Sequence, residues 1–222
     1  MNKIWQRLRP LARDLFILIT GIMLSLILNE LRNNQRAKAE EQRIMQQLIS
    51  DIGRDTTELN NSITTLEEIL TLDDVWRDLE QAPYERYLAA VQLASFHPFA
   101  PQQTALQELA YSGQSSNIRR GDLVAAANSL HRGDYATLKE IERLFTDYLV
   151  SDFIPYTNDF APYLIDTTPD EEETRNIEIF LDNPRFKNRA DWVVVLIVNN
   201  LGALEYAKHS AKNILLQLEA AY

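Results

Sequence analysis

The hydrophobic pattern begins with a run of fourteen residues, 15–28, without a charged side chain. As a helix this run measures roughly 21 Å, and it approaches the ~30 Å of a hydrocarbon core only when Leu11, Ala12 and Leu31 are added. Its apolar side chains surround the helix, whereas a core helix of a soluble protein keeps them in one stripe. The pattern therefore predicts a transmembrane helix over 15–31, with its core at 15–28. The residues assigned to this membrane anchor are Leu15, Phe16, Ile17, Leu18, Ile19, Gly21, Ile22, Met23, Leu24, Ser25, Leu26, Ile27 and Leu28.

A cleaved signal peptide is the main alternative for this run, because it has the same basic start and short apolar centre. Asn29 and Glu30 follow the run directly, however, and no small-residue cleavage site lies there. An uncleaved span is therefore favoured. Gly21 and Ser25 lie four residues apart on one face, a spacing that permits close helix contact in a membrane and that is also tolerated in any span.

After the span, helix-forming residues continue from Gln35 to Pro83 and predict one long helix leaving the membrane. A heptad seam of apolar residues runs along it, made of Met45, Ile52, Leu59 and Leu66. A second seam is apolar only at its ends and consists of Leu48, Asp55, Ser62 and Ile69. A coiled-coil dimer would use both seams, so the polar half of the second seam favours packing within a monomeric bundle.

Prolines and glycines divide the next part of the chain. They predict helices over 84–96 and 102–111, with Gly113 just past the end of the second one. The tripeptide Arg-Gly-Asp occurs at 120–122 and again at 132–134. We expect each glycine to end a helix and the aspartates Asp122 and Asp134 to cap the next one. A cell-adhesion role rests on three residues that match often by chance.

The remaining pattern predicts two more helices and an ordered aromatic loop. Residues 135–153 place apolar side chains on one helical face, and 154–169 contain three prolines and form the loop. Thr168 is expected to cap a helix that starts at Pro169. The last segment, 188–221, is strongly helical, and its turn at 193–198 is apolar all round, which predicts burial on several sides.

These elements together predict an all-α fold. An N-terminal transmembrane helix continues into a long helix, which packs with a long C-terminal helix and shorter helices in one bundle. The expected organisation is a basic tail over 1–14, the transmembrane helix over 15–31 and an acidic helical-bundle domain over 32–222.

Charge is distributed unevenly along the chain. Residues 1–43 carry a net charge of +4, so the remainder carries −14 of the total of −10. The basic part suits the anionic headgroups of a membrane, and the acidic part opposes nucleic-acid binding. Four basic residues before the span favour a cytoplasmic N-terminus. We expect a bacterial inner-membrane protein with a periplasmic C-terminal domain.

The sequence contains few residues in an arrangement that could carry out chemistry. The chain has no cysteine, and none of its three histidines (His97, His131 and His209) forms a metal-binding motif. Glu205 and His209 share a helical face, but two ligands are too few for a metal site. The acidic residues 170–173 suit either a cation or a helix N-terminus, and the second explanation is simpler. The sequence predicts no enzyme, cofactor, metal or small-molecule substrate.

The order of motifs resembles a family of uncharacterised bacterial single-pass membrane-anchored proteins. The matching residues are the run 28–36 after the span, the phrase 96–101, then Thr104, Leu109, Ser112, Gly113, Ile118 and Leu123. The chain departs from the family at Asn29 and Glu30 and throughout its C-terminal half. The resemblance implies an anchored helical domain and no catalytic residue.

The function expected from these observations is that of an accessory or scaffold protein. The anchor would present the bundle to another membrane-associated protein or to further copies of the chain. The alternative is a ligand-sensing module that acts through a partner. Its pocket would lie among the aromatic residues Tyr148, Phe153, Tyr156, Phe160 and Tyr163.

Overall fold

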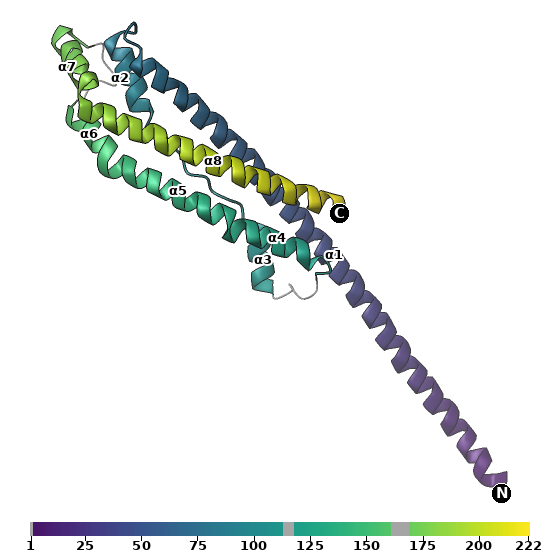
Figure 1. The fold of residues 1–222 in the computed structure, drawn as a ribbon. Coiled ribbons are helices and arrows are strands. Elements are labelled where there is room, and N and C mark those ends of the chain that lie inside the picture. Colours follow the sequence, from purple (N-terminus) through teal and green to yellow (C-terminus); the bar gives the residue numbers. More distant parts are fainter. Residues whose placement is uncertain (1, 113–117, 161–168) are drawn as a thin grey trace.

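The fold is built on one exceptionally long helix. A computed structural model describes residues 2–112, 118–160 and 169–222. Helix α1, Asn2–Arg77, runs without interruption for 76 residues, roughly 114 Å at 1.5 Å per residue. Its first half projects alone from the rest of the molecule (Figure 1) and its second half is part of a bundle. The predicted span and the predicted long helix are therefore one continuous element.

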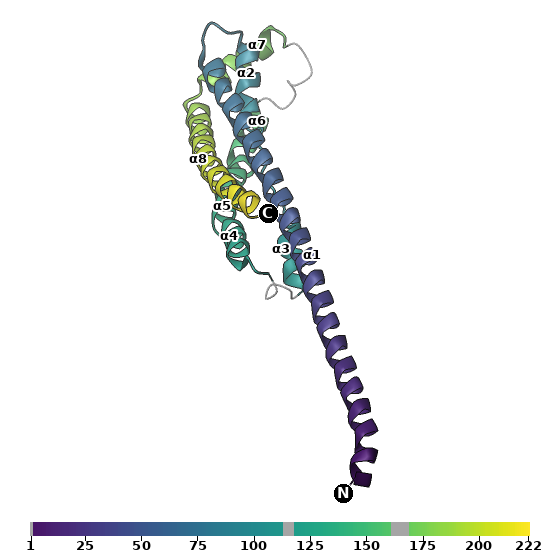
Figure 2. The same cartoon turned by 90° about the vertical axis from the view of Figure 1, so that its right-hand side faces the viewer.

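The other elements are helical throughout the described residues and complete the bundle around α1. They are α2 (Pro83–Gln92), α3 (Thr104–Ser112), α4 (Gly121–Arg132), α5 (Asp134–Tyr148), the π-helical turn η2 (Leu149–Phe153), α6 (Ile154–Phe160), α7 (Glu171–Asp182) and α8 (Pro184–Ala221). Helix α8 packs along α1 and also along α5. Figure 2 shows the same bundle from the side, with α8 at one outer edge. The predicted all-α bundle of two long helices and several short ones is confirmed.

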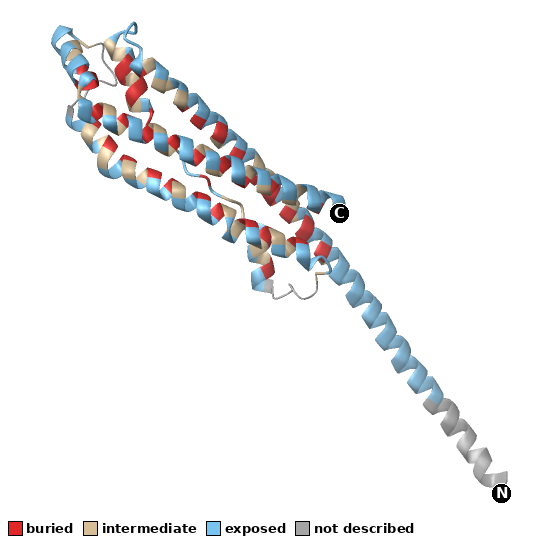
Figure 3. Ribbon diagram, viewed as in Figure 1, coloured by how far each residue is buried: buried red, intermediate tan, exposed pale blue. Residues whose placement is uncertain are grey.

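The core between the two long helices is formed by the seams of α1 and one seam of α8, and buried residues of the shorter helices extend it. The apolar seam from Met45 to Leu66 is buried along its whole length, as Figure 3 shows for this half of α1. The facing seam of α8 is completely buried and consists of Ile197, Leu204, Ala211 and Leu218. The apolar turn of α8 is buried on one side only, because Val195 and Val198 remain exposed. The expectation that this turn is buried on several sides was wrong.

Two predicted helix caps lie elsewhere in the structure. Helix α4 begins at Gly121 with Arg120 at its N-cap, so Asp122 lies within the first turn and not at the cap. Its carboxylate accepts hydrogen bonds from the Arg120 guanidinium. Gly133 ends α4 and is also the N-cap of α5, so Asp134 is the first residue of α5. Both aspartates still lie at the positive end of a helix dipole.

Gly133 is required for a close approach and not for a left-handed backbone. Its N–H donates to the carbonyl of Ser129 at 2.8 Å, and a Cβ at this position would lie 2.8 Å from that same oxygen. A single residue therefore separates two helices, which leaves no room for a separate capping aspartate. The predicted cap residue Gly113 lies outside the described residues.

The expected aromatic loop begins as a helix. Helices α5, η2 and α6 follow one another without a break as far as Phe160. The wider turn at η2 precedes Pro155, which has no N–H to donate, and a widened turn accommodates such a residue inside a helix. The described residues resume at 169, and α7 is capped by Asp170 through a reciprocal capping box with Glu173. The Glu173 N–H donates to the Asp170 carboxylate at 2.8 Å, and the Asp170 N–H donates to the Glu173 carboxylate at 2.9 Å. Thr168, the expected cap, lies outside the described residues.

Candidate functional site

The most conspicuous surface of the molecule is the apolar first half of α1. Residues 16–28 are exposed along every side of the helix, and Phe16 leaves 70% of its surface accessible. Within the described residues, α1 is the one helix long and apolar enough to cross a membrane. The Thr20 hydroxyl donates to the Phe16 carbonyl at 2.8 Å, so its hydrogen bond is satisfied within the helix. The predicted anchor residues from Phe16 onward thus share one element without tertiary contacts, while the side chain of Leu15 lies outside the described part.

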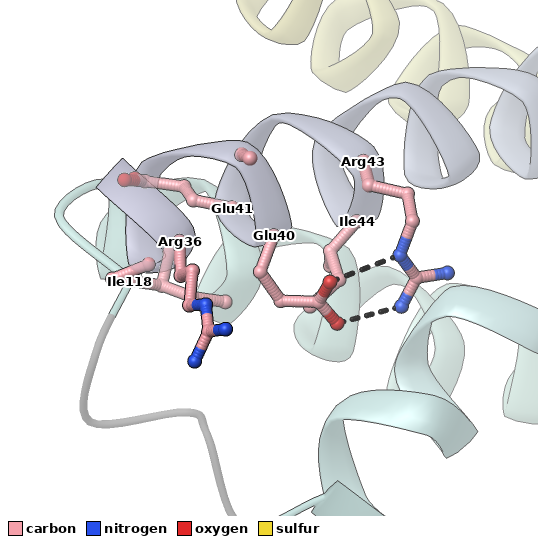
Figure 4. A pocket seen from close by; sticks show the side chains of 8 residues that line it. Arg36, Glu40, Glu41, Arg43, Ile44 and Ile118 are labelled. Atoms are coloured by element: carbon pink, nitrogen blue, oxygen red, sulfur yellow. Dashed lines mark hydrogen bonds and ion pairs between the residues drawn. The ribbon is translucent and has the colours of Figure 1, made fainter. Parts of the chain in front are cut away.

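Where α1 enters the bundle it forms the wall of an open pocket of about 550 Å³ (Figure 4). Arg43 is the central side chain. It binds Glu40 on its own helix at 2.7 Å and also pairs with Glu108 of α3. The hydrogen bond from Arg43 lowers the pKa of the Glu40 carboxyl. These contacts hold α3 against the base of the bundle, and the pocket is lined by Arg36, Ala37, Ala39, Glu40, Glu41, Arg43, Ile44 and Ile118.

Glu41 of α1 binds both the segment before α4 and the C-terminal residue at the end of the bundle nearest the predicted span. Its buried carboxylate accepts the Arg119 N–H at 2.9 Å and the Tyr222 hydroxyl at 2.8 Å. Burial, assisted by the hydrogen bond to Glu41, raises the pKa of Tyr222 to about 12. The segment before α4 and the end of α8 therefore close on α1 at one residue, about ten residues beyond the predicted span.

Further along α1, two buried carboxylates bind backbone N–H groups of the segment between α2 and α3 and of the first turn of α3. Asp51 accepts the Ala105 N–H at 2.8 Å, and Asp55 accepts the Gln102 N–H at 2.7 Å. Glu142 of α5 accepts the Phe99 N–H of the same segment at 2.9 Å. The segment has no regular structure of its own, so these carboxylates satisfy backbone donors that would otherwise be buried without a partner. We call Asp51, Asp55 and Glu142 the carboxylate clamp.

Burial perturbs the ionisation of two members of the carboxylate clamp, Asp55 and Glu142. Desolvation raises the pKa of Asp55 to about 6, and it raises the pKa of Glu142 to about 7. The Tyr135 hydroxyl and Asp55 Oδ2 are buried near one another without a hydrogen bond of acceptable geometry, and burial raises the pKa of Tyr135 as well. The cluster therefore holds carboxylates that are costly to ionise, in positions fixed by backbone N–H groups.

His131 lies beside this cluster. Its ring packs edge-on against Tyr135 with 4.8 Å between the ring centres, and desolvation lowers its pKa. Both ring nitrogens are buried and make no hydrogen bond. A general base must reach the proton that it removes, and these nitrogens offer a substrate no access. Among the described residues there is also no group of three or more histidine, aspartate and glutamate side chains that could hold a metal.

The described aromatic residues of the alternative function belong to the core or pack against it. Phe153 is fully buried and lies 6.3 Å from Phe186, centre to centre, while Tyr156 lies 6.1 Å from Phe180. The Tyr148 hydroxyl donates to the Arg189 carbonyl at 3.3 Å. These side chains fill the space in which a ligand would have to bind. Tyr163 and the side chain of Phe160 lie outside the described residues.

Sequence reasoning missed the carboxylate clamp for a physical reason. Asp55 interrupts an apolar seam, and this was interpreted as a weaker seam and not as a buried acceptor. The signal was present, because the segment that it binds contains Pro98 and Pro101 and cannot form a helix that pairs its own N–H groups.

Comparisons with known proteins add no further identification. No protein-family model, curated protein or solved structure matches this chain. The family resemblance drawn from the motifs after the span stays a prediction, and function has to be inferred from the molecule itself.

Proposed function

We propose that this protein is a membrane-anchored helical accessory or scaffold protein of the bacterial inner membrane. Its tail lies in the cytoplasm, its acidic bundle lies in the periplasm, and the bundle binds another membrane-associated protein. The observation that carries the proposal is the continuity of α1, whose exposed apolar half and bundle-forming half belong to one uninterrupted helix.

In this proposal, the continuous helix sets the height of the bundle above the bilayer. The predicted span ends at Leu31 and the bundle contacts begin at Glu41, a rise of roughly 15 Å in a helix. A bundle on such a short rigid stalk reaches targets that lie within its own length of the membrane surface. That geometry suits a membrane-associated partner better than a freely diffusing one.

The contacts within the bundle favour a rigid structure over conformational change at a ligand site. The carboxylate clamp and the closure at Glu41 hold the irregular segments and the start of α3 against α1 and α5. The side chains that could bind an aromatic or apolar ligand pack against one another instead. A rigid shape with a large exposed surface suits protein recognition, because little conformational entropy is lost on binding.

The test is capture of the partner from membranes. The tagged full-length chain is cross-linked in intact cells, extracted in mild detergent and purified, and a reproducible membrane-associated protein is expected in stoichiometric amount. The matched control carries Leu24→Arg, which disfavours insertion and should abolish capture. Recovery of the same protein with equal yield from the control would contradict the role of the anchor, and absence of any copurifying protein would refute the proposal.

Orientation needs its own measurement. A reporter that is active only in the periplasm is fused after Tyr222, and activity is expected. Activity of a cytoplasm-specific reporter at the same position would reverse the proposed topology.

A further inference from the structure

Helix α8 is buried along one side and open along the opposite side. Figure 1 shows α8 between α1 and α5, both of which it contacts, and Figure 2 shows it at one outer edge of the bundle. The side facing α1 carries the fully buried seam from Ile197 to Leu218. The opposite side would ordinarily be charged, because it faces water.

Instead, the opposite side carries an uncharged strip that we call the outer seam. Its positions alternate by three and four residues, which is the a and d spacing of a coiled coil, and all of them are exposed. It extends over roughly 36 Å at 1.5 Å per residue. The exposed fractions of Trp192, Tyr206 and Leu216 are 50%, 65% and 63%. The outer seam consists of Trp192, Val195, Asn199, Gly202, Tyr206, His209, Asn213 and Leu216.

We propose that the outer seam is a dimer interface, at which α8 of one copy pairs in parallel with α8 of a second copy. Two copies anchored in one bilayer by α1 point in the same direction, so a two-fold axis along the membrane normal relates them. That symmetry makes the α8 helices parallel and sets each seam position opposite itself.

The polar members of the outer seam fit this pairing. Asn199 and Asn213 occupy a positions, where an asparagine opposite its own copy can donate and accept an amide hydrogen bond at once. Asparagine at such a position selects a register and a two-stranded partner at some cost in stability. A seam of this composition therefore specifies a matching helix and does not act as a general apolar patch.

The residues flanking the outer seam also tolerate a second copy. In a parallel pair, a flanking g residue meets the e residue five positions later on the other helix. Glu205 then faces Ser210 and Lys212 faces Gln217, so no like charges meet. This matters because each chain carries a net charge of −10, and two copies can approach closely only where the surface is neutral.

The extent of the surface is adequate for a dimer. The exposed apolar side chains of the outer seam and the adjacent Val198, counted on both copies, offer on the order of 1,000–1,500 Å² for burial, near the lower end of stable interfaces. Gly202 lies near the middle with no atom within 4 Å of a Cβ built on it. The absence of a side chain there lets the two helices approach closely between Tyr206 and Asn199.

Cysteine cross-linking in native membranes tests the interface directly, because the chain has no cysteine of its own. Opposed d positions in a parallel pair lie within reach of a disulfide, so full-length Gly202→Cys is expected to form a covalent dimer on mild oxidation. The matched control is Ala136→Cys, an exposed position on α5 outside the outer seam, which should stay monomeric. Equal cross-linking of both variants, or none at Gly202, would overturn the proposal.

Two further variants complete the test. The double substitution Trp192→Glu with Tyr206→Glu places charges on exposed positions, so the helical circular dichroism should be unchanged while the dimer dissociation constant in detergent rises at least tenfold. An unchanged dissociation constant contradicts the interface. Cross-linking at Ser25→Cys without cross-linking at Gly202→Cys would move the contact into the span, and a Gly202 adduct with a different protein would refute self-pairing. The parallel direction of the pair rests on the proposed membrane anchor. Self-pairing and partner capture are scored on different bands, so each can fail alone.

Discussion

The carboxylate of Glu142 should make the bundle less stable as the pH rises. Its side chain is only 2% exposed and accepts the Phe99 N–H, and burial raises its pKa from the ordinary 4.5 to about 7. Between these two values the folded protein keeps a proton that the unfolded chain has released. Stability therefore falls as the pH rises through this window and is level above it. This rise in the pKa of Glu142 lowers the free energy of unfolding by roughly 3 kcal/mol at pH 8 compared with acidic pH.

The perturbation that isolates this effect is Glu142→Gln. The glutamine carbonyl can still accept the Phe99 N–H, while its new amide N–H₂ group is buried at a cost of about 1–2 kcal/mol. The variant should therefore be about 1–2 kcal/mol more stable than the wild type at pH 8 and no more stable at pH 4.5. The crossover distinguishes this carboxyl from the general relief of charge repulsion on acidification, which both proteins share.

The assay is guanidinium unfolding of the full-length chain in a non-ionic detergent. Circular dichroism follows the helices, and the fluorescence of the buried Trp76 follows the core. Both proteins are compared at pH 4.5, 6, 7 and 8. If Glu142→Gln showed the same pH dependence as the wild type, Glu142 would not be the group that titrates and the reasoning would be refuted.

Three further predictions follow from the same structure. Asp51→Ala removes the acceptor of the Ala105 N–H at the start of α3, and should cost about 2–3 kcal/mol and speed hydrogen exchange in α3; unchanged exchange would contradict the clamp. Leu59→Ala in the fully buried seam should cost about 2–5 kcal/mol, whereas Leu144→Ala at a half-exposed position should change the unfolding free energy by less than about 0.5 kcal/mol; equal effects would contradict the assigned packing. Leu24→Arg should move the chain from the membrane fraction to the soluble or degraded fraction, since a charge at the centre of a span costs about 3 kcal/mol; retention in the membrane would count against the span.

The parts of the fold that were predictable are those that periodicity controls. The seam from Met45 to Leu66 repeats every seven residues and is buried as expected, and the C-terminal helix lies along it. Periodicity identifies a helix face and its length, and two long faces of similar length have few ways to be buried except against each other.

The parts that were not predictable depend on tertiary contacts or on single-residue positions. The helix cap at Asp134 was misplaced because Gly133 serves two helices at once, and the cap at Asp122 was misplaced because α4 already begins at Gly121. The prolines of the segment 93–103 indicate backbone N–H groups that need acceptors, but which acidic side chains accept them depends on the tertiary packing of α1 and α5. The outer surface of α8 was misjudged because an all-round apolar turn is equally compatible with a buried helix and with an interface between molecules.

The central claim is that α1 crosses a membrane and continues without a break into the bundle. Cysteine scanning along residues 17–44, followed by labelling with a membrane-impermeant maleimide in sealed membranes, tests it most directly. Positions 17–28 should be protected, positions 32–39 should be labelled on all sides of the helix, and positions from Glu41 onward should be labelled with helical periodicity. Uniform labelling of positions 17–28 would contradict the account.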